Sequence, residues 1–189
     1  MKWKNQLTGM KPYQPGRSTD EVKEMFGLET IVKLASNENP FGFSPKVSEF
    51  LENQSINHAI YPDGYATGLR QALAKSVGVE QNQLLFGNGS DEIIMMISRA
   101  LLQTGVNTVM ATPTFPQYRH NAVIDGAEVR EVQLANGAHD LQEMARQIDE
   151  NTAVVWLCSP NNPTGMLIDQ QELEEFIRKV PKEVLVVLD

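Results

Sequence analysis

The feature that most constrains the fold is a regular alternation of helical and strand-like segments from Thr67 onward. Apolar runs typical of strands span residues 83–89, 107–113, 127–134, 152–158 and 183–189. Amphipathic segments typical of helices span residues 67–78, 90–104, 115–126, 141–149 and 169–180. Strands joined through helices pair in parallel, because each helix returns the chain to the starting edge of the sheet. We therefore predict an α/β fold with a mainly parallel, open sheet and helices on both faces.

The first 60 residues follow a less regular pattern. Residues 1–18 carry two prolines and two glycines and predict an extended arm. A short helix is expected over residues 20–27, ending at Gly27, and a second helix over 45–53 with a proline in its first turn. Between them, residues 31–45 predict a short strand that runs into a long loop.

The composition excludes several classes of protein. The chain carries 16 Lys and Arg against 24 Asp and Glu, a net charge of −8. This balance argues against nucleic-acid binding, which needs clustered basic residues, and against a basic helix on a membrane surface. No apolar run approaches the roughly 20 residues that cross a bilayer. Because Cys158 is the only cysteine, we expect no disulfide within the chain and a soluble, cytoplasmic protein.

The segment FGNGSDE (86–92) combines a strand end, a glycine turn and the start of a helix. We expect Ser90 or Asp91 to cap this helix, whose free N–H groups and dipole attract an anion such as phosphate. A dinucleotide-binding fingerprint would require a third glycine where Glu92 stands. A plain junction between a strand and a helix is the alternative interpretation.

Two later loops also leave strands and are stiffened by proline. In TPTFPQY (112–118), Phe115 would either offer a stacking surface to a flat ligand or pack in the core. In CSPNNPTG (158–165), prolines restrict the backbone on both sides of an asparagine pair. We expect Asn162 to be held in one direction as a binding amide, with an elaborate turn as the alternative.

Asp189 ends the apolar run EVLVVLD. It would serve either as a strand-end cap or as the partner of a cationic ligand group, because an unpaired carboxylate beside apolar residues is costly. Open α/β sheets bind ligands beyond the carboxyl ends of their strands, so we expect a chain that stops here to be a piece of a longer protein. His58, His120 and His139 lack the spacing of metal ligands, and no metal site is expected.

Six segments in this order resemble the fold-type I pyridoxal-phosphate-dependent aminotransferases. They are NENPFG (37–42), YPDGYATGLRQALA (61–74), GNGSDE (87–92), TPTFPQY (112–118), SPNNPTG (159–165) and VVLD (186–189). With KPYQPG (11–16), the chain resembles the histidinol-phosphate aminotransferases within that family. The resemblance implies pyridoxal 5'-phosphate as cofactor and amino transfer from histidinol phosphate to 2-oxoglutarate in histidine biosynthesis. Another amino-acid aminotransferase, aromatic or not, a related decarboxylase, and a non-catalytic binding module remain alternatives.

The resemblance also implies roles for residues of the regular part of the chain. The helix start at Ser90, Asp91 and Glu92 would hold the cofactor phosphate. Phe115 would stack on the pyridine ring, and Asn162 would bind the ring hydroxyl. Asp189 would pair with the pyridinium nitrogen and keep it protonated, because an opposite charge favours the charged form. A protonated ring accepts the electrons released from the substrate more readily.

Further roles implied by the resemblance involve a second subunit and the substrate. Tyr61 would reach the cofactor phosphate of the neighbouring subunit in a homodimer, and Tyr13 would help to close the neighbour's substrate site. Asn39 would contact the small-molecule substrate. The resemblance divides the chain into an N-terminal arm and small-domain segment (1–60) and the first part of a large cofactor-binding domain (61–189).

One feature of the family is absent from the sequence. The Schiff-base lysine and the substrate-binding arginines would follow Asp189, and none of the lysines present stands in the corresponding context. We therefore expect the full-length protein to be an enzyme and the 189-residue chain by itself to be inactive.

Overall fold

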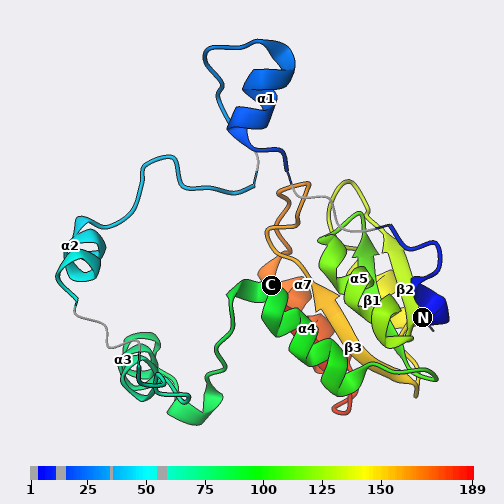
Figure 1. Ribbon diagram of the computed structural model, residues 1–189. Helices are drawn as coiled ribbons and strands as arrows, with labels where there is room; N and C mark the ends of the chain where they lie inside the picture. Colours follow the sequence, from blue (N-terminus) through cyan, green and yellow to red (C-terminus); the bar gives the residue numbers. More distant parts are fainter. Residues whose placement is uncertain (1–3, 12–15, 35, 55–58) are drawn as a thin grey trace. The chain divides into compact units, whose positions relative to one another are not determined.

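The chain divides into two compact units. The computed structural model describes residues 4–11, 16–34, 36–54 and 59–189 (Figure 1). Unit 1 consists of Met1–Tyr13 and Leu85–Asp189, and unit 2 of Gln14–Leu84. The domain boundary predicted between residues 60 and 61 stays a prediction.

Unit 1 is built on a four-stranded parallel sheet with the strand order β2-β1-β3-β4. The strands are β1 (Asn107–Thr112), β2 (Glu128–Gln133), β3 (Thr152–Leu157) and β4 (Leu185–Leu188). In each of the two central strands, β1 and β3, five of the six residues are buried, so both faces of the sheet are covered. The predicted α/β fold class is confirmed.

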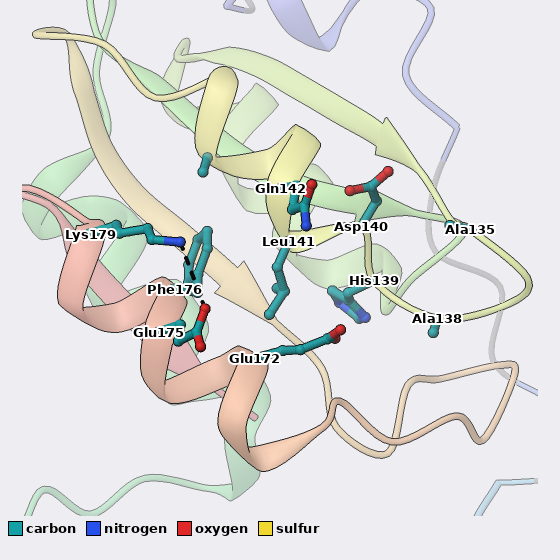
Figure 2. Close-up of a pocket in the computed structure, with 11 residues that line it drawn as sticks. Ala135, Ala138, His139, Asp140, Leu141, Gln142, Glu172, Glu175, Phe176 and Lys179 are labelled. Carbon is teal, nitrogen blue, oxygen red and sulfur yellow. Dashed lines mark ion pairs between the residues drawn. The ribbon is translucent and has the colours of Figure 1, made fainter.

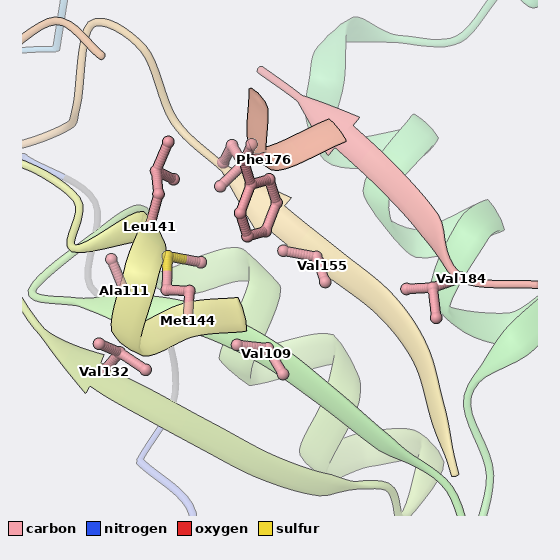
Figure 3. Packing of buried hydrophobic residues seen from close by; sticks show 9 residues of the cluster. Val109, Ala111, Val132, Leu141, Met144, Val155, Phe176 and Val184 are labelled. Carbon is pink, nitrogen blue, oxygen red and sulfur yellow. The ribbon is translucent and has the colours of Figure 1, made fainter. Parts of the chain in front are cut away.

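The helices of unit 1 cover the two faces of this sheet. They are α4 (Gly89–Leu101), α5 (Pro116–Asp125), α6 (Leu141–Arg146) and α7 (Gln170–Lys179). On one face, α6 and α7 pack over a buried cluster that includes Val109, Val155 and Phe176 (Figure 3). On the other face, α4 and α5 pack around Tyr118 and Trp156. Alternate residues of the central strands join different clusters, as the pleat of a strand requires.

The described residues of unit 2 form helices and no strand. The helices are α1 (Thr19–Phe26), α2 (Pro45–Asn53), α3 (Thr67–Val77) and the 3₁₀ helix η2 (Gln81–Gln83). Gly27 and Gly78 end α1 and α3 in the left-handed conformation, with φ of 64° and 75°, which glycine adopts without strain. The three α-helices therefore begin and end close to where the sequence predicts.

Two of the predicted strands are wrong. Within the described residues, neither the segment 31–45 nor the segment 83–89 contains a strand or pairs with one. A strand persists only when a neighbour satisfies its backbone N–H and C=O groups, and an apolar sequence does not supply that neighbour. Leu34, counted as part of the first predicted strand, is 95% exposed.

The predicted cap of α4 is also wrong. The helix begins at Gly89, and its N-cap is Asn88 instead of Ser90 or Asp91. The Oε2 atom of Glu92 accepts hydrogen bonds from the backbone N–H of Asn88 (2.6 Å) and from its side-chain Nδ2 (2.9 Å). Glu92 thus satisfies the backbone N–H of the cap residue from within the first turn, an interaction that single-residue capping preferences do not reveal.

The N-terminal segment, predicted as an extended arm, is described from Lys4 to Lys11. It contains the 3₁₀ helix η1 (Asn5–Leu7) and no buried residue. The Nζ atom of Lys4 donates a hydrogen bond to the carbonyl of Ile124 (3.0 Å), near the end of α5. This contact attaches the segment to unit 1.

Candidate functional site

Two loops, one strand end and one helix start carry the predicted site residues of unit 1. The loops follow the carboxyl ends of β1 and β3, Asp189 directly follows β4, and the helix is α4. The carboxyl ends of parallel strands lie along one edge of the sheet, where open α/β folds bind their ligands. The sequence order therefore brings Phe115, Asn162 and Asp189 to one edge.

Asn161 organises this edge, although the sequence reasoning chose its neighbour. It is buried, and its Nδ2 donates to the carbonyl of Pro113 (3.2 Å) and to Oγ1 of Thr164 (3.0 Å). Its Oδ1 accepts a hydrogen bond from Oγ1 of Thr114 (2.8 Å). Asn161 thus joins the loop after β1 to the loop after β3. The pair of adjacent asparagines was the one sequence signal for this role, because a single ligand contact needs only one of them and the other can stabilise the loop.

Asn162 has the opposite environment. Its side chain is exposed and makes no hydrogen bond within the described residues, while its backbone N–H donates to Sγ of Cys158 (3.4 Å). The peptide bonds Ser159–Pro160 and Asn162–Pro163 are both cis. The backbone of Asn162 is therefore held through Cys158, while its side-chain amide is not engaged by the described residues.

Asp189 continues the hydrogen-bond ladder beyond β4. Its N–H donates to the carbonyl of Leu157 (2.8 Å), and its carbonyl accepts from the N–H of Ser159 (2.9 Å). The Oη atom of Tyr118 donates a hydrogen bond to Oδ2 of Asp189 at 2.6 Å. Both the backbone and one carboxylate oxygen of this residue are therefore fixed.

Tyr118, which the sequence reasoning did not single out, lies in an aromatic group. Its ring stacks on Trp156 with the centroids 5.0 Å apart, and Phe115 meets it edge to face at 5.6 Å. Burial and the hydrogen bond to Asp189 raise the pKa of Tyr118 far above its ordinary value of 10. The phenol is therefore a permanent donor at neutral pH. In the sequence, Tyr118 is the last residue of the motif TPTFPQY, and this position was the only indication of its role.

The start of α4 is suited to an anion. The backbone N–H groups of Ser90 and Asp91 belong to the first turn, where a helix leaves its donors without internal acceptors. Gln117 Nε2 donates to Asp91 Oδ2 at 3.4 Å, which links this helix start to α5. A Cβ atom at Gly87 would come within 2.9 Å of Cδ1 of Ile93, so a larger residue there would require the Ile93 side chain to shift.

Asn39 and Tyr61, two further predicted site residues, belong to unit 2 and are described within that unit alone. Asn39 uses its side chain locally: Nδ2 donates to the carbonyl of Gly42 (2.8 Å), and Oδ1 accepts from the N–H of Phe41 (3.0 Å). Tyr61 is 98% exposed. Tyr13 lies outside the described residues. The roles of these three residues stay predictions.

A pocket of about 360 Å³ lies elsewhere, between α6, α7 and the loop before α6 (Figure 2). None of the predicted site residues lines it; its polar lining includes His139, Glu172 and the ion pair Glu175–Lys179. Among the described residues, no group of three or more His, Cys, Asp or Glu side chains is arranged to hold a metal ion. The candidate functional site is therefore the carboxyl edge of the sheet and not this pocket.

His139 supports the loop after β3 from the side of this pocket. Its Nε2 accepts a hydrogen bond from the backbone N–H of Cys158 (3.3 Å), and burial lowers its pKa below the ordinary value of 6.5. An imidazole that accepts through Nε2 is neutral and carries its proton on Nδ1. His139 therefore positions Cys158 only while it is uncharged.

Comparisons with known proteins agree with these observations. The sequence profile of the family described as "Aminotransferase class I and II" matches residues 29–189. Over all 189 residues, the chain is 59% identical to a histidinol-phosphate aminotransferase of Lysinibacillus sphaericus (strain C3-41) and 58% identical to one of Geobacillus thermodenitrificans (strain NG80-2). It covers 52% of each, so the chain spans about half the length of the curated relatives it matches.

A solved structure has the same fold. The histidinol-phosphate aminotransferase from Sinorhizobium meliloti, determined in complex with pyridoxal-5'-phosphate, matches with a TM-score of 0.86 and 23% sequence identity. The match covers 99% of this chain and 50% of that one. At this identity the likeness concerns the fold, which is therefore the fold expected from the sequence motifs.

Proposed function

The chain belongs to the class I and II aminotransferases, and from this premise we propose a reaction for the full-length protein. It transfers the amino group of histidinol phosphate to 2-oxoglutarate, giving imidazole acetol phosphate and glutamate in histidine biosynthesis. The proposal is supported by whole-chain identities of 59% and 58% to proteins named histidinol-phosphate aminotransferase. It concerns the full-length protein, because the chain spans about half the length of these relatives.

The observation that carries the proposal is the environment of Asp189. Its carboxylate lies at the carboxyl end of β4, with Oδ2 held by Tyr118 at 2.6 Å and no hydrogen bond to Oδ1 within the described residues. A fixed carboxylate with one open oxygen suits a cationic N–H group of a ligand. The protonated ring nitrogen of pyridoxal 5'-phosphate is such a group.

The other residues of the edge fit the rest of this cofactor. The N–H groups of Ser90 and Asp91 would bind its phosphate at the start of α4. Glu92 would act by shaping the turn, since its carboxylate is engaged with Asn88. Phe115, half-buried beside Tyr118, would support one face of the ring, and the amide of Asn162 would bind the ring hydroxyl.

The residues of this chain would contribute binding and orientation to the reaction. Pyridoxal phosphate, when bound, takes up the electrons released as a proton leaves the α-carbon of the amino substrate. Asp189 would hold a proton at the ring nitrogen by opposite-charge stabilisation. Phe115 and Asn162 would fix the tilt and rotation of the ring, which orientation-dependent catalysis requires.

We further propose a homodimer in which each subunit completes the site of the other. Tyr61 is almost fully exposed, and Asn39 lies on an exposed loop of unit 2. Tyr61 would bind the cofactor phosphate of the neighbour, Tyr13 would close the neighbour's substrate site, and Asn39 would contact substrate. A two-fold dimer allows this exchange to be reciprocal.

We propose a cytoplasmic location for the enzyme. The free, buried Cys158 needs no oxidising compartment. In the described part of the chain, no helix has the length and apolar character of a membrane span. Cell fractionation that recovers the protein with the membranes would contradict this location.

Steady-state assays of the full-length protein test the reaction. Histidinol phosphate and phenylalanine are compared as amino donors with 2-oxoglutarate as acceptor, and the ratio of kcat/KM values is measured. A large preference for histidinol phosphate is expected, and a large preference for phenylalanine would overturn the assignment of substrate. If the protein neither binds pyridoxal phosphate nor gains stability from it, a non-catalytic binding module replaces the enzyme.

A further inference from the structure

Tyr118 is held more tightly than a packing role requires. It is completely buried on α5, stacked at 11° on Trp156 of β3, and met edge to face by Phe115. Contacts on two sides restrict the ring to one orientation. The position of its Oη atom is therefore set by the aromatic group and not by the residue it binds.

The phenol has one short, charge-assisted contact. Its Oη donates to Oδ2 of Asp189 at 2.6 Å, a length typical of an O–H group bound to a carboxylate. The side chain of Asp189 is otherwise exposed, and within the described residues no second donor reaches it. Among the described residues, Tyr118 is therefore the group that orients this carboxylate.

The contact joins elements that are distant in sequence. The donor comes from α5, the stacking partner from β3 and the acceptor from the end of β4, 71 residues after the donor. Packing alone gives no reason for the hydroxyl, because phenylalanine would fill the same space against Trp156. An unneeded buried phenol would also carry the desolvation cost of its O–H group.

We propose that Tyr118 is a positioning residue that turns the carboxylate of Asp189 so that Oδ1 meets the ring nitrogen of the bound cofactor. This inference rests on the proposed function, because the ring nitrogen belongs to pyridoxal 5'-phosphate. In this role Tyr118 would act through Asp189, to which its Oη donates, and not by contact with cofactor or substrate. Removal of its hydroxyl should therefore affect only the interaction that involves the ring nitrogen.

A pair of cofactors isolates that interaction. Pyridoxal 5'-phosphate and its 1-deaza analogue, in which C–H replaces the ring nitrogen, are titrated into the full-length apoprotein, and the two dissociation constants are measured. In Tyr118→Phe, we expect affinity for pyridoxal phosphate to fall roughly tenfold, the usual scale for a hydrogen bond to a charged group. Affinity for the deaza analogue should stay unchanged.

Two further variants serve as controls. Thr108→Val removes a buried hydroxyl of β1, which donates to the carbonyl of Val154 at 2.8 Å, and should change neither affinity. Asp189→Asn should bind pyridoxal phosphate no more tightly than the deaza analogue. In the double variant Asp189→Asn with Tyr118→Phe, the ratio of the two dissociation constants should change no further. If Tyr118→Phe does not fold, Tyr118→Met supplies a second apolar side chain without a donor.

The outcomes separate the two proposals. Equal weakening of both cofactors by Tyr118→Phe, or none of either, overturns the positioning role while the proposed function stands. A parent protein that binds neither cofactor overturns the proposed function and the inference with it. Loss of affinity for pyridoxal phosphate alone, absent in the Asp189→Asn background, supports the inference.

Discussion

The two units differ in where their apolar side chains lie. Unit 1 buries clusters on both faces of its sheet, whereas among the described residues of unit 2 only Ala74 is buried. The helices of unit 2 nevertheless begin and end close to where the sequence predicts, with Gly27 after α1 and Gly78 after α3. Caps and glycines act within one turn of a helix, but burial needs a second layer of structure. Helix boundaries are therefore specified by nearby residues, whereas burial of a helix face requires a second element to pack against it.

The strands follow the same rule. β3 is central, lies between β1 and β4, and is formed as predicted. The segment 31–45 has apolar residues at its start, but no strand lies beside its described residues. Similar sequence signals thus give a strand in one unit and an irregular segment in the other.

The largest expected effect tests whether the chemistry belongs to unit 1. Asp189→Ala in the full-length protein should reduce turnover by orders of magnitude with little change in stability, because the ring nitrogen would lose the partner of its proton. Asp189→Glu should retain more activity, since the charge survives at a shifted position. Single-turnover kinetics on cofactor-saturated variants measures this step.

Asp20→Ala, which removes an exposed carboxylate from α1 of unit 2, is the matched control and should leave turnover unchanged. If Asp189→Ala reacts as fast as the parent protein, the assignment of Asp189 and of the whole edge is wrong.

The next effect compares one substitution in both units. Phe176 of α7 is 3% exposed and Phe50 of α2 is 60% exposed. Phe176→Ala should lower the free energy of unfolding of the 189-residue chain by about 3–5 kcal/mol, the usual result for a buried phenylalanine. Phe50→Ala should change it by no more than about 0.5 kcal/mol. Denaturant unfolding gives both values.

An equal loss in the two variants would contradict the difference in burial between the two units, because it would mean that other residues cover α2. Phe50→Ala is then repeated in the full-length protein. A larger loss there than in the 189-residue chain would show that α2 is buried by residues absent from this chain or by a second subunit.

A smaller effect separates the two adjacent asparagines of unit 1. Asn161→Ala leaves Thr114 and the carbonyl of Pro113 without a partner and should cost roughly 2 kcal/mol of unfolding free energy. Asn162→Ala should cost about 0.5 kcal/mol or less, because its side chain is exposed. Thermal unfolding and cofactor titration are measured on both. A reversed order of the two stabilities would contradict the structural role of Asn161 and the binding role of Asn162.

The smallest expected effect is a pH dependence that arises from His139. Burial lowers its pKa in the folded state below 6.5, so the unfolded chain binds the proton more readily. The contribution to stability is complete above pH 6.5 and is lost as the pH falls toward the lowered pKa. His139→Gln, which keeps an acceptor for Cys158, should flatten the stability curve between about pH 7 and pH 5. Equal curves for the parent and His139→Gln would refute the assignment.

Much of the fold was predictable because its signals are local. The parallel sheet follows from apolar runs joined by helices, and β1, β3 and α7 begin within a residue of where the pattern predicts. The edge that carries Phe115, Asn162 and Asp189 was predictable because connectivity alone sends these loops to one side. Asn161 and Tyr118 were missed because their partners, Thr114 and Asp189, are 47 and 71 residues away.

The sequence by itself determined the positions of the helices, the parallel order of the sheet and the residue types at the strand ends, since periodicity, glycines and prolines act over a few residues. Tertiary structure alone decided which asparagine is buried, which hydroxyl holds Asp189, which cap begins α4 and which apolar runs become strands. The physical reason is that these outcomes depend on burial and on hydrogen-bond partners brought together from distant segments. No single segment carries that information before the sheet is assembled.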